Sequence, residues 1–358
     1  MIRIHIGTRK GWFELTKTNN KWQISQFAFA GVPVSNTLAQ NGSDTFYAAL
    51  NHGHFGVKFH RSDDAGKNWQ EISSPTYPKD ANEENAPSLE LGWCLEYAND
   101  STDALWAGTI PGGLFYSGDK GENWQLNENL WYQDSRKNWF GGGYDKPGIH
   151  SICVHPNNSQ HMTIGISCGG VWVSEDGGLN WKVQADGMRA EYMPPEQAYD
   201  PYIQDPHRLV QNQLNPNVLW AQHHNGIFVS KDGAKSWSEI TTASPSHFGF
   251  AVVSHPKDEN VAWFVPAIKD ECRIPVDGKL VVMRTSDGGK TFTTLTQGLP
   301  QSHAYDLIYR HGLDIDNSGE LLVMGSTTGN LWISENSGEN WEMISNFLPP
   351  IYSVRFVK

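Results

Sequence analysis

Short apolar runs alternate with polar, glycine-containing turns along the whole chain, and the alternation is periodic. In each of six units a run of three or four β-prone residues precedes a polar turn, and an aromatic residue opens a second short run after it. One example is Ile227-Phe228-Val229 before the turn and Trp237-Ser238-Glu239-Ile240 after it. Two β-prone runs separated by such a turn are typical of a β-hairpin.

Two more strand-like runs lie upstream of each hairpin. They cover 149–154 and 162–166 in the fourth unit, and 304–309 and 320–324 in the seventh. Four strands in a unit of about 50 residues are typical of a β-propeller blade, and a period of this length indicates a repeat architecture. The pattern therefore predicts an all-β protein built of four-stranded blades.

The turn inside each hairpin follows an eight-residue pattern, Ser-x-Asp-x-Gly-x-(Asn/Thr)-aromatic. Asp can accept hydrogen bonds from backbone N–H groups of a tight turn, Gly can adopt a positive φ, and the aromatic ring can bury a large apolar area. Two copies depart from the pattern, with Ala234 in place of Gly and Asn336 in place of Asp. The six copies start at Ser62, Ser117, Ser174, Ser230, Thr285 and Ser334, so that successive starts lie 55, 57, 56, 55 and 49 residues apart.

This octapeptide resembles the Asp box, the BNR repeat of sialidase-like and sortilin-like propellers, and the resemblance spans essentially the whole chain. It implies a β-propeller whose repeated turns lie on one face and whose active or binding surface lies on the other. Arg273-Ile274-Pro275 is similar to the Arg-Ile-Pro motif of sialidases, but it precedes the copy at Thr285 instead of opening the first blade. The arginine triad and the Tyr–Glu pair of sialidases have no evident match, so the resemblance does not imply a true sialidase.

The two ends of the chain decide the number of blades. Residues 2–6 and 12–15, with a degenerate copy of the octapeptide running from Leu15 to Trp22, supply three strands of a further unit. Residues 351–357 supply its missing innermost strand. Pairing strands from both ends closes the ring and removes exposed sheet edges. We therefore predict a single seven-bladed β-propeller domain over residues 1–358.

Composition narrows the classes of partner. The net charge is −12 and basic residues form no runs, which argues against nucleic acids and acidic membranes as partners. No apolar stretch approaches the roughly 18 residues that a membrane span needs. The chain enters a strand at once, with no apolar signal core, so we expect a cytoplasmic protein. Cys94, Cys153, Cys168 and Cys272 are scattered without CxxC spacing, which predicts free thiols.

The predicted topology assigns most of the chemistry-bearing side chains to one face. Loops between blades and loops between second and third strands share that face, and it receives eight of the 14 histidines. Three long insertions, 127–147, 185–206 and 266–279, lie on the same face and carry many aromatic residues. Loops of more than about 12 residues in a compact domain are usually functional or disordered, and disorder goes with few aromatics.

These observations favour a carbohydrate-active, glycoside hydrolase-like enzyme that acts on an anionic or oligomeric sugar. Hydrolysis needs two carboxylates, for which Asp205 also lies on the predicted face, and guanidinium groups bind a carboxylate through paired hydrogen bonds. The residues expected in catalysis are His207, Asp270 and Glu271; those expected to bind substrate are Arg208, Arg273, Trp139, Tyr144, Tyr202 and His223.

Two alternatives remain open. Histidine is the natural base near neutral pH, so the protein could be a polysaccharide lyase that abstracts a proton next to a uronate carboxylate. Imidazoles that converge on the central channel could also hold Mn²⁺ or Zn²⁺. The third reading is a non-catalytic propeller that binds a glycan or a protein on its aromatic face. The candidate metal ligands are His150, His207, His224 and His303.

Overall fold

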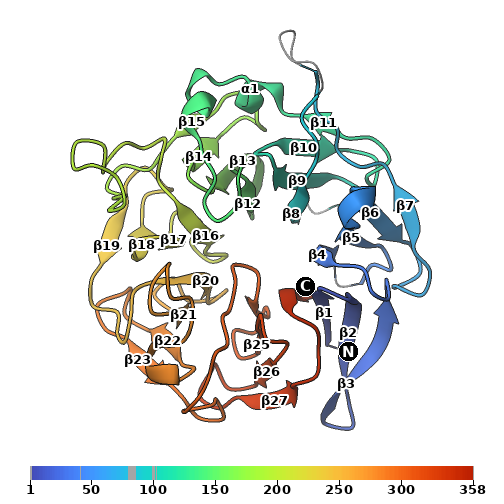
Figure 1. The fold of residues 1–358 in the computed structure, drawn as a ribbon, viewed down its shortest axis with the longest axis vertical. Helices are drawn as coiled ribbons and strands as arrows, with labels where there is room; N and C mark the ends of the chain where they lie inside the picture. Colours follow the sequence, from blue (N-terminus) through green and yellow to red (C-terminus); the bar gives the residue numbers. More distant parts are fainter. Residues whose placement is uncertain (1, 41, 80–85, 99–100, 102, 358) are drawn as a thin grey trace.

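Seven four-stranded antiparallel sheets stand around a central axis as the blades of a propeller (Figure 1). The computed structural model describes residues 2–40, 42–79, 86–98, 101 and 103–357. The predicted seven-bladed β-propeller is therefore confirmed. In the part of the chain described here, no helix is long and apolar enough to cross a membrane.

The first blade joins both ends of the chain, as predicted. It consists of β1 (Arg3–Thr8), β2 (Gly11–Thr18), β3 (Lys21–Ala28) and the C-terminal strand β28 (Ile351–Phe356), in the order β28-β1-β2-β3. Ile4 pairs with Phe356 and Ile6 with Val354. The innermost strand of this blade thus comes from the far end of the sequence and closes the ring.

The other six blades follow one another along the chain, each with its first strand nearest the axis. Blade two comprises β4 (Val34–Ala39), β5 (Phe46–Asn51), β6 (Val57–Ser62) and β7 (Gln70–Ile72). Blade three comprises β8 (Leu91–Tyr97), β9 (Leu105–Ile110), β10 (Leu114–Ser117) and β11 (Gln125–Leu126). Blade four comprises β12 (Ile149–His155), β13 (Asn158–Ile166), β14 (Gly170–Ser174) and β15 (Lys182–Val183). Blade five comprises β16 (Pro206–Gln211), β17 (Leu219–His223), β18 (Ile227–Ser230) and β19 (Ser238–Ile240). Blade six comprises β20 (Gly249–Ser254), β21 (Ala262–Pro266), β22 (Val282–Thr285) and β23 (Thr293–Leu295). Blade seven comprises β24 (Leu313–Ile315), β25 (Leu322–Gly325), β26 (Leu331–Ser334) and β27 (Glu342–Ser345). Short helices lie in the connections: α1 (Glu128–Trp131), η1 (Gly53–Phe55), η2 (Asp134–Asn138) and η3 (Val276–Gly278).

One predicted strand is wrong. Residues 304–309 are irregular, and the inner strand of the seventh blade is β24 (Leu313–Ile315). Side-chain contacts hold the irregular segment outside the ladder: Leu307 packs in a cluster with Phe248 and Phe250, and the carboxylate of Asp306 accepts hydrogen bonds from neighbouring side chains. The segment consequently runs beside the central channel.

The hydrophobic core lies between neighbouring blades. One cluster joins Trp263 and Val282 of the sixth blade to Met324 and Trp332 of the seventh. Five tryptophans rank among the largest fully buried side chains. Because every blade buries apolar side chains against the next, the ring as a whole is needed to complete the core. These five residues are Trp12, Trp172, Trp220, Trp263 and Trp332.

The octapeptide turns share one hydrogen-bond pattern in all six copies. The first hydroxyl donates to the side-chain oxygen of the third residue at 2.8–3.0 Å and accepts the N–H of the fifth at 2.8–2.9 Å. The third side chain then accepts the N–H of the seventh residue at 2.8–3.0 Å. Ala234 keeps the positive φ of the glycine it replaces, at 70°, and Asn336 accepts the bond that Asp accepts elsewhere.

The degenerate N-terminal copy forms a different turn. Asn19 and Asn20, with φ of 51° and 59°, make a two-residue connection between β2 and β3. Two successive positive φ values match the tight hairpin turn whose twist suits the flanking strands. The period is thus kept in the first blade although the octapeptide geometry is not.

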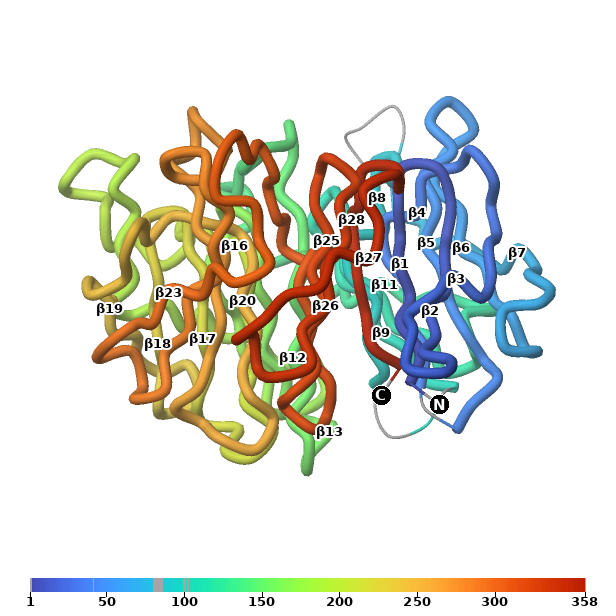
Figure 2. Tube along the Cα trace, turned by 90° about the horizontal axis from the view of Figure 1, so that it is seen from below, coloured from blue at the N-terminus to red at the C-terminus, as the bar shows by residue number. Residues whose placement is uncertain are grey.

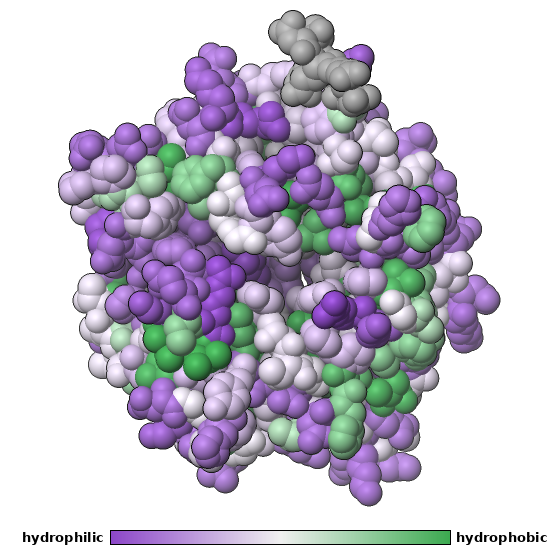
Figure 3. Space-filling view, in the orientation of Figure 1, coloured by the Kyte–Doolittle hydropathy of each residue, from purple (hydrophilic) through white to green (hydrophobic). Residues whose placement is uncertain are grey.

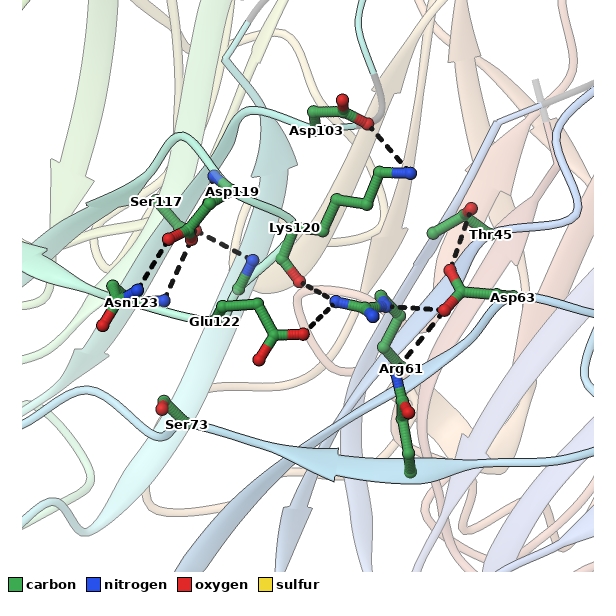
Figure 4. A network of polar contacts seen from close by, with 12 residues as sticks. Thr45, Arg61, Asp63, Ser73, Asp103, Ser117, Asp119, Lys120, Glu122 and Asn123 are labelled. Carbon is green, nitrogen blue, oxygen red and sulfur yellow. Dashed lines mark hydrogen bonds and ion pairs between the residues drawn. The ribbon is translucent and has the colours of Figure 1, made fainter.

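Arginines that precede two octapeptides join one blade to the next, and Figure 4 shows the link made by Arg61. Arg61, just before Ser62, donates to the carbonyl of Lys120 at 3.0 Å and pairs with Glu122 at 2.7 Å. Arg284, just before Thr285, donates to the carbonyl of Ser337 at 3.1 Å and pairs with Glu339 at 2.7 Å. The partners occupy the fourth and sixth positions of the next octapeptide in both cases, so the link is itself repeated.

The long connections and the chain ends lie on opposite faces. Figure 2 shows the ring edge-on, with the longest loops projecting from the upper face, while the chain enters β1 and leaves β28 at the lower face. In an antiparallel blade the connections between first and second strands and between third and fourth strands share one face. The octapeptides, between third and fourth strands, therefore lie opposite the long loops.

Candidate functional site

A cavity of about 800 Å³ opens at the centre of the loop-rich face. The space-filling view shows this face hollowed at its centre, with hydrophilic and hydrophobic surface both reaching the rim (Figure 3). Every blade contributes to the lining, through the starts of inner strands, connections between blades, or connections between second and third strands. Lining residues include Trp93, Tyr144, Asp205, His207, His224, Asp270, Arg273, Tyr309, Arg310 and Tyr352.

A second cavity, of about 790 Å³, opens at the opposite mouth of the channel. Its lining includes Arg208, Asp314 and Arg355. His311 borders both cavities, and its Nε2 lies 2.9 Å from the carbonyl oxygen of His150. The channel is thus divided near His311 into two cavities that have different lining residues.

Register shifts at the start of the inner strands aim side chains at the loop-rich cavity. In blades two to six the pairing of the first strand skips one residue close to its beginning. An extra residue in one strand changes the direction in which side chains point. The skipped residues are Ser35, Trp93, His150, His207 and Phe250. All but His150 line the cavity, and the ring of His150 packs against Trp93 with centroids 5.3 Å apart.

Asp205, His207 and His224 form the most concentrated polar cluster of the cavity. Asp205 and His207 flank Pro206 at the start of β16, and His224 follows β17. The Oδ2 of Asp205 lies 3.4 Å from the Nε2 of His207 and 3.6 Å from the Nδ1 of His224. The three ligand-type atoms all lie within 4.8 Å of one another.

Hydrogen bonds orient this cluster from behind. The Nδ1 of His207 lies 2.7 Å from the carbonyl oxygen of Gly249, so Nδ1 carries the proton and donates it. The Oδ1 of Asp205 accepts the backbone N–H of Cys168 at 3.2 Å. The imidazole of His207 also stacks on Phe250, with ring centroids 4.3 Å apart. The remaining atoms, Nε2 of His207 and Oδ2 of Asp205, are thereby turned toward each other.

The charge states follow from burial and from the neighbours. Burial opposes ionisation of Asp205, but His207, His224 and Arg310 hold the pKa of its carboxyl well below the usual range. Burial lowers the pKa of His207, an effect that Asp205 opposes without reversing. The centre therefore combines an ionised carboxylate with neutral imidazole at neutral pH.

Arg310 is a buried cation whose side chain is enclosed by aromatic rings. Only 7% of it is exposed, and its guanidinium lies 4.9 Å from the ring centre of Trp93 and 5.3 Å from that of Phe250. Its Nε is buried and makes no hydrogen bond. Arg273 lies 5.3 Å from the same Phe250 ring and is paired with Asp270 at 2.5 Å. Two guanidinium groups thus face one cavity, and among the described residues no carboxylate is bonded to that of Arg310.

The structure brings together five of the predicted site residues. They line the loop-rich cavity and come from the third-to-fourth blade connection and from blades five and six. The side chain of Tyr144 is half-exposed and lies edge-on against Trp93, with centroids 5.2 Å apart. These five residues are Tyr144, His207, His224, Asp270 and Arg273.

Three predicted site residues lie outside this cavity because of the local backbone. The side chain of Glu271 is 76% exposed and faces Lys269 instead of the cavity. Arg208 follows the register shift at His207 and lines the opposite mouth, where it donates to the carbonyl of His150 at 3.1 Å. His303 is exposed, with a φ of 54°. The predicted pairing of Arg208 with Arg273 on one substrate is incompatible with this placement.

Four others pack in or against the core. The buried Trp139 and the partly buried Tyr202 both pack against Trp172, with ring centroids 5.6 and 5.9 Å from it, and neither lines the cavity. His223 is fully buried against Phe228, and burial lowers its pKa to about 3. His150 is fully buried as well, and burial holds its pKa well below the usual range. These residues support the walls of the cavity from behind.

Sequence reasoning missed the buried guanidinium of Arg310 and the role of Trp93. Arg310 directly follows the run 304–309, whose pattern predicts a strand. That pattern does not indicate that the side chain of Arg310 faces a cavity. Trp93 resembles any other core tryptophan until the register shift turns it toward the cavity. The one available signal was the His311-Gly312 pair, which marks a turn beside the channel.

Comparisons of sequence give a partial match. No protein-family profile matches the chain. The chain is 29% identical to sortilin of Rattus norvegicus over 159 residues, and equally to sortilin of Mus musculus. The match spans 42% of this chain and 16% of the sortilins, so most of the length of these relatives lies outside it.

Comparisons of structure agree on the fold. The GH74 xyloglucanase from Xanthomonas campestris is similar with a TM-score of 0.67 and 16% identity, over 96% of this chain and 52% of that one. YCF48 bound to D1 peptide is similar with a TM-score of 0.56 and 13% identity, over 92% and 89% of the two chains. At such identities the likeness establishes a shared β-propeller fold.

Proposed function

We propose that this chain is a carbohydrate-active propeller of the Asp-box type, which binds an anionic saccharide in the loop-rich cavity and acts on it there. The similarity to sortilin and to a glycoside hydrolase propeller supports the assignment at the level of the fold. The octapeptide turns, with their common hydrogen bonds, support the Asp-box assignment.

The observation that carries the proposal is the state of Arg310. A buried charge without a bonded partner is costly, so such groups are usually paired. Arg310 makes no ion pair within 4 Å in the described part of the chain, although the cavity leaves its guanidinium accessible from one side. A carboxylate or sulfate on the ligand would be the missing anionic partner of this guanidinium. Trp93 and Tyr144 lie close to it, and their rings could pack against the face of a sugar.

The carboxylates of the cavity favour elimination over hydrolysis. Hydrolysis needs one protonated carboxyl group as general acid. Asp205 is held ionised, Asp270 is paired with Arg273, and Glu90 is paired with Lys146 at 2.7 Å. Asp205 has a lowered pKa and the other two carboxylates are engaged by cationic side chains, so none of the three is prepared to act as the general acid.

Elimination requires groups that this cavity supplies. Arg310 and Arg273 would neutralise the carboxylate of a uronate, which acidifies the neighbouring C–H bond. The centre formed by Asp205, His207 and His224 would supply the base that removes this proton. The bonding electrons form a carbon–carbon double bond as the glycosidic C–O bond breaks, and the departing oxygen takes a proton from a phenol of the lining, for which Tyr309 is placed beside Arg310.

A panel of polysaccharides tests the proposal. Purified protein is incubated with uronate-containing polymers and with neutral xyloglucan, and both ultraviolet absorbance and new reducing ends are followed. Elimination produces both signals, because the product carries a conjugated double bond. Reducing ends without ultraviolet absorbance would establish hydrolysis instead, and saturable binding without either signal would make the protein a binding module, as the likeness to YCF48 bound to D1 peptide suggests. No binding of any anionic saccharide would overturn the proposal.

A further inference from the structure

We propose that Asp205, His207 and His224 bind a divalent transition-metal ion, with the open side of the site turned toward the cavity. The inference deepens the proposed function, because the ion would provide the base and the anion-binding position of that same centre. It replaces the four-histidine site expected from the sequence, since His150 is enclosed in the core and His303 lies outside the cavity.

The spacing of the three ligand atoms fits a metal ion. Zinc–ligand bonds of about 2.0–2.2 Å at tetrahedral angles place neighbouring ligand atoms about 3.3–3.6 Å apart. The Oδ2 of Asp205 lies 3.4 Å from one imidazole nitrogen and 3.6 Å from the other. The two nitrogens, on His207 and His224, lie within 4.8 Å of each other. An ion in contact with all three atoms needs only a small adjustment of the more exposed His224.

Direct hydrogen bonding explains this spacing less well. Charge-assisted hydrogen bonds between imidazolium and carboxylate are normally about 2.7–2.9 Å long. Both contacts of Asp205 Oδ2 exceed that range by about half an ångström or more. The orientation of the ring adds a second reason: Nδ1 of His207 donates to Gly249, which turns Nε2 toward the carboxylate oxygen. A cation placed between these two atoms would contact both at metal–ligand distance.

The supporting contacts are those that metal ligands usually have. Metal-binding histidines commonly donate their second N–H to a carbonyl or carboxylate, which fixes the ring and its tautomer. His207 does this to Gly249 at 2.7 Å. Asp205 uses Oδ1 to accept the N–H of Cys168, which leaves Oδ2 for the ion. Phe250 stacked on His207 fixes the plane of the ring.

The backbone of Gly142 limits the site on one side. A Cβ atom at this position would lie 3.1 and 3.2 Å from the two carboxylate oxygens of Asp205, and 2.9 Å from the sulfur of Cys168. A side chain there would crowd the carboxylate, whereas glycine leaves its approach free. His207 and His224 both line the cavity, so further coordination positions are reached from it. Three protein ligands with an open position are typical of catalytic sites, whereas structural zinc sites are closed by four.

The chemistry of two imidazoles and one carboxylate selects the ion. This donor set suits Zn²⁺, Fe²⁺ or Mn²⁺ and disfavours Ca²⁺ and Mg²⁺, which prefer oxygen. The deep burial of Asp205 and His207 limits the coordination number, and the ligand spacing matches tetrahedral geometry, so Zn²⁺ is the first choice. A bound Zn²⁺ lowers the pKa of its water to about 7, which supplies a base at neutral pH.

Metal binding is measured directly, without reference to turnover. The protein is stripped with EDTA, dialysed, and titrated calorimetrically with ZnCl₂ and, separately, MnCl₂; Co²⁺ is added in parallel, and its visible absorption reports tetrahedral coordination. We expect binding of about one Zn²⁺ per chain. His224→Gln and Asp205→Asn should weaken Zn²⁺ binding by at least about 100-fold, because each removes one of only three ligands. His303→Gln, at the exposed histidine, is the matched control and should bind as the wild type does.

Two results would overturn the inference: no stoichiometric Zn²⁺ or Mn²⁺ binding to correctly folded wild-type protein, or equal affinity in wild type and His224→Gln. Circular dichroism of each variant separates loss of ligand from loss of fold, and His224 is exposed enough for its substitution to be tolerated. Failure of the metal site and failure of the proposed function are distinct. If metal binds and no saccharide does, only the proposed function is wrong; if a saccharide binds and no metal does, only the metal inference is wrong.

Discussion

The two faces of the propeller use their polar residues in opposite ways. On the octapeptide face, six turns repeat one set of hydrogen bonds, and the serine or threonine at the start of each is almost fully buried and fully bonded. On the loop-rich face, equivalent positions of successive blades carry Ser35, Trp93, His150, His207 and Phe250, which share a backbone register shift and no chemistry.

The difference indicates where stability and function reside. A position that repeats in every blade serves the blade, because each blade has the same turn to close and the same neighbour to pack against. A position that shares backbone geometry but varies in side chain is free to serve a ligand. The buried guanidinium of Arg310 and the imidazole–carboxylate centre both occur on the variable face, and neither recurs in another blade within the described part of the chain.

The largest expected effect is a loss of stability from a substitution on the octapeptide face, with no change at the loop-rich face. Trp181→Ala removes a buried ring that packs in a core cluster and donates to Asn127 at 3.0 Å. The free energy of unfolding should fall by about 3–5 kcal/mol, as for other buried tryptophans. Denaturant unfolding measures this loss, and Zn²⁺ binding to the folded fraction should be unchanged. A loss of affinity with no loss of stability would show that the two faces are not separable as described.

Arg310→Met tests the loop-rich face and should show the opposite result, which is weaker binding of the saccharide without a loss of stability. Truncating one partner of a buried charge pair costs about 2–5 kcal/mol, so binding or turnover of the anionic saccharide should fall by at least about 30-fold. Stability should be retained or increased, because a buried charge without a bonded partner is replaced by an apolar side chain. Kinetics and thermal unfolding are measured together.

Arg208→Met is the matched control for that experiment. Arg208 belongs to the same sequence neighbourhood as His207 but lines the opposite cavity. Its substitution should leave saccharide affinity within about twofold of wild type, since a charge this far from the ligand is screened. Equal losses in Arg208→Met and Arg310→Met would contradict the assignment of the loop-rich cavity.

A smaller effect is expected from one hydroxyl of the octapeptide face. Ser174 accepts the N–H of Gly178 at 2.8 Å and donates to Asp176 at 2.9 Å, and it is 1% exposed. Ser174→Ala leaves a buried N–H without a partner, which should cost about 1–3 kcal/mol. Glu175→Ala changes an exposed residue of the same turn and should cost less than about 0.5 kcal/mol. Similar midpoints for the two variants in urea would refute the role given to the hydroxyl.

The smallest effect concerns pH and compares two copies of the octapeptide. Hydrogen bonds from Thr291 lower the pKa of Asp287 to about 2, below its unfolded value, so its contribution to stability is present above the unfolded pKa and is lost as pH falls through the folded pKa. Asp287→Asn should flatten the dependence of stability on pH in that acidic range. Asn336→Asp, in the copy that lacks the carboxylate, should steepen it. Thermal unfolding at a series of acidic pH values tests both, and parallel curves for the two variants would count against the explanation.

Much of the architecture was predictable because local sequence patterns determine it. Alternating short runs, the octapeptide and its period of about 50 residues determine the strands, the hairpins and the number of blades. The closing strand β28 was predictable because the first unit lacked a strand that residues 351–357 could supply. The misassigned strand at 304–309 shows the limit, since its pattern fits a strand but the contacts of Leu307 and Asp306 hold it elsewhere.

The sequence by itself determined the repeat, the seven blades and the face on which function was to be sought. Only the tertiary structure decided which side chains meet there. A register shift of one residue sends His207 into one cavity and Arg208 into the other, and a contact between blades five and six fixes the tautomer of His207. Asp205, His224 and Arg310 become neighbours of one cavity only after the ring closes. Local periodicity encodes elements, whereas the site depends on distances between elements, which no local pattern records.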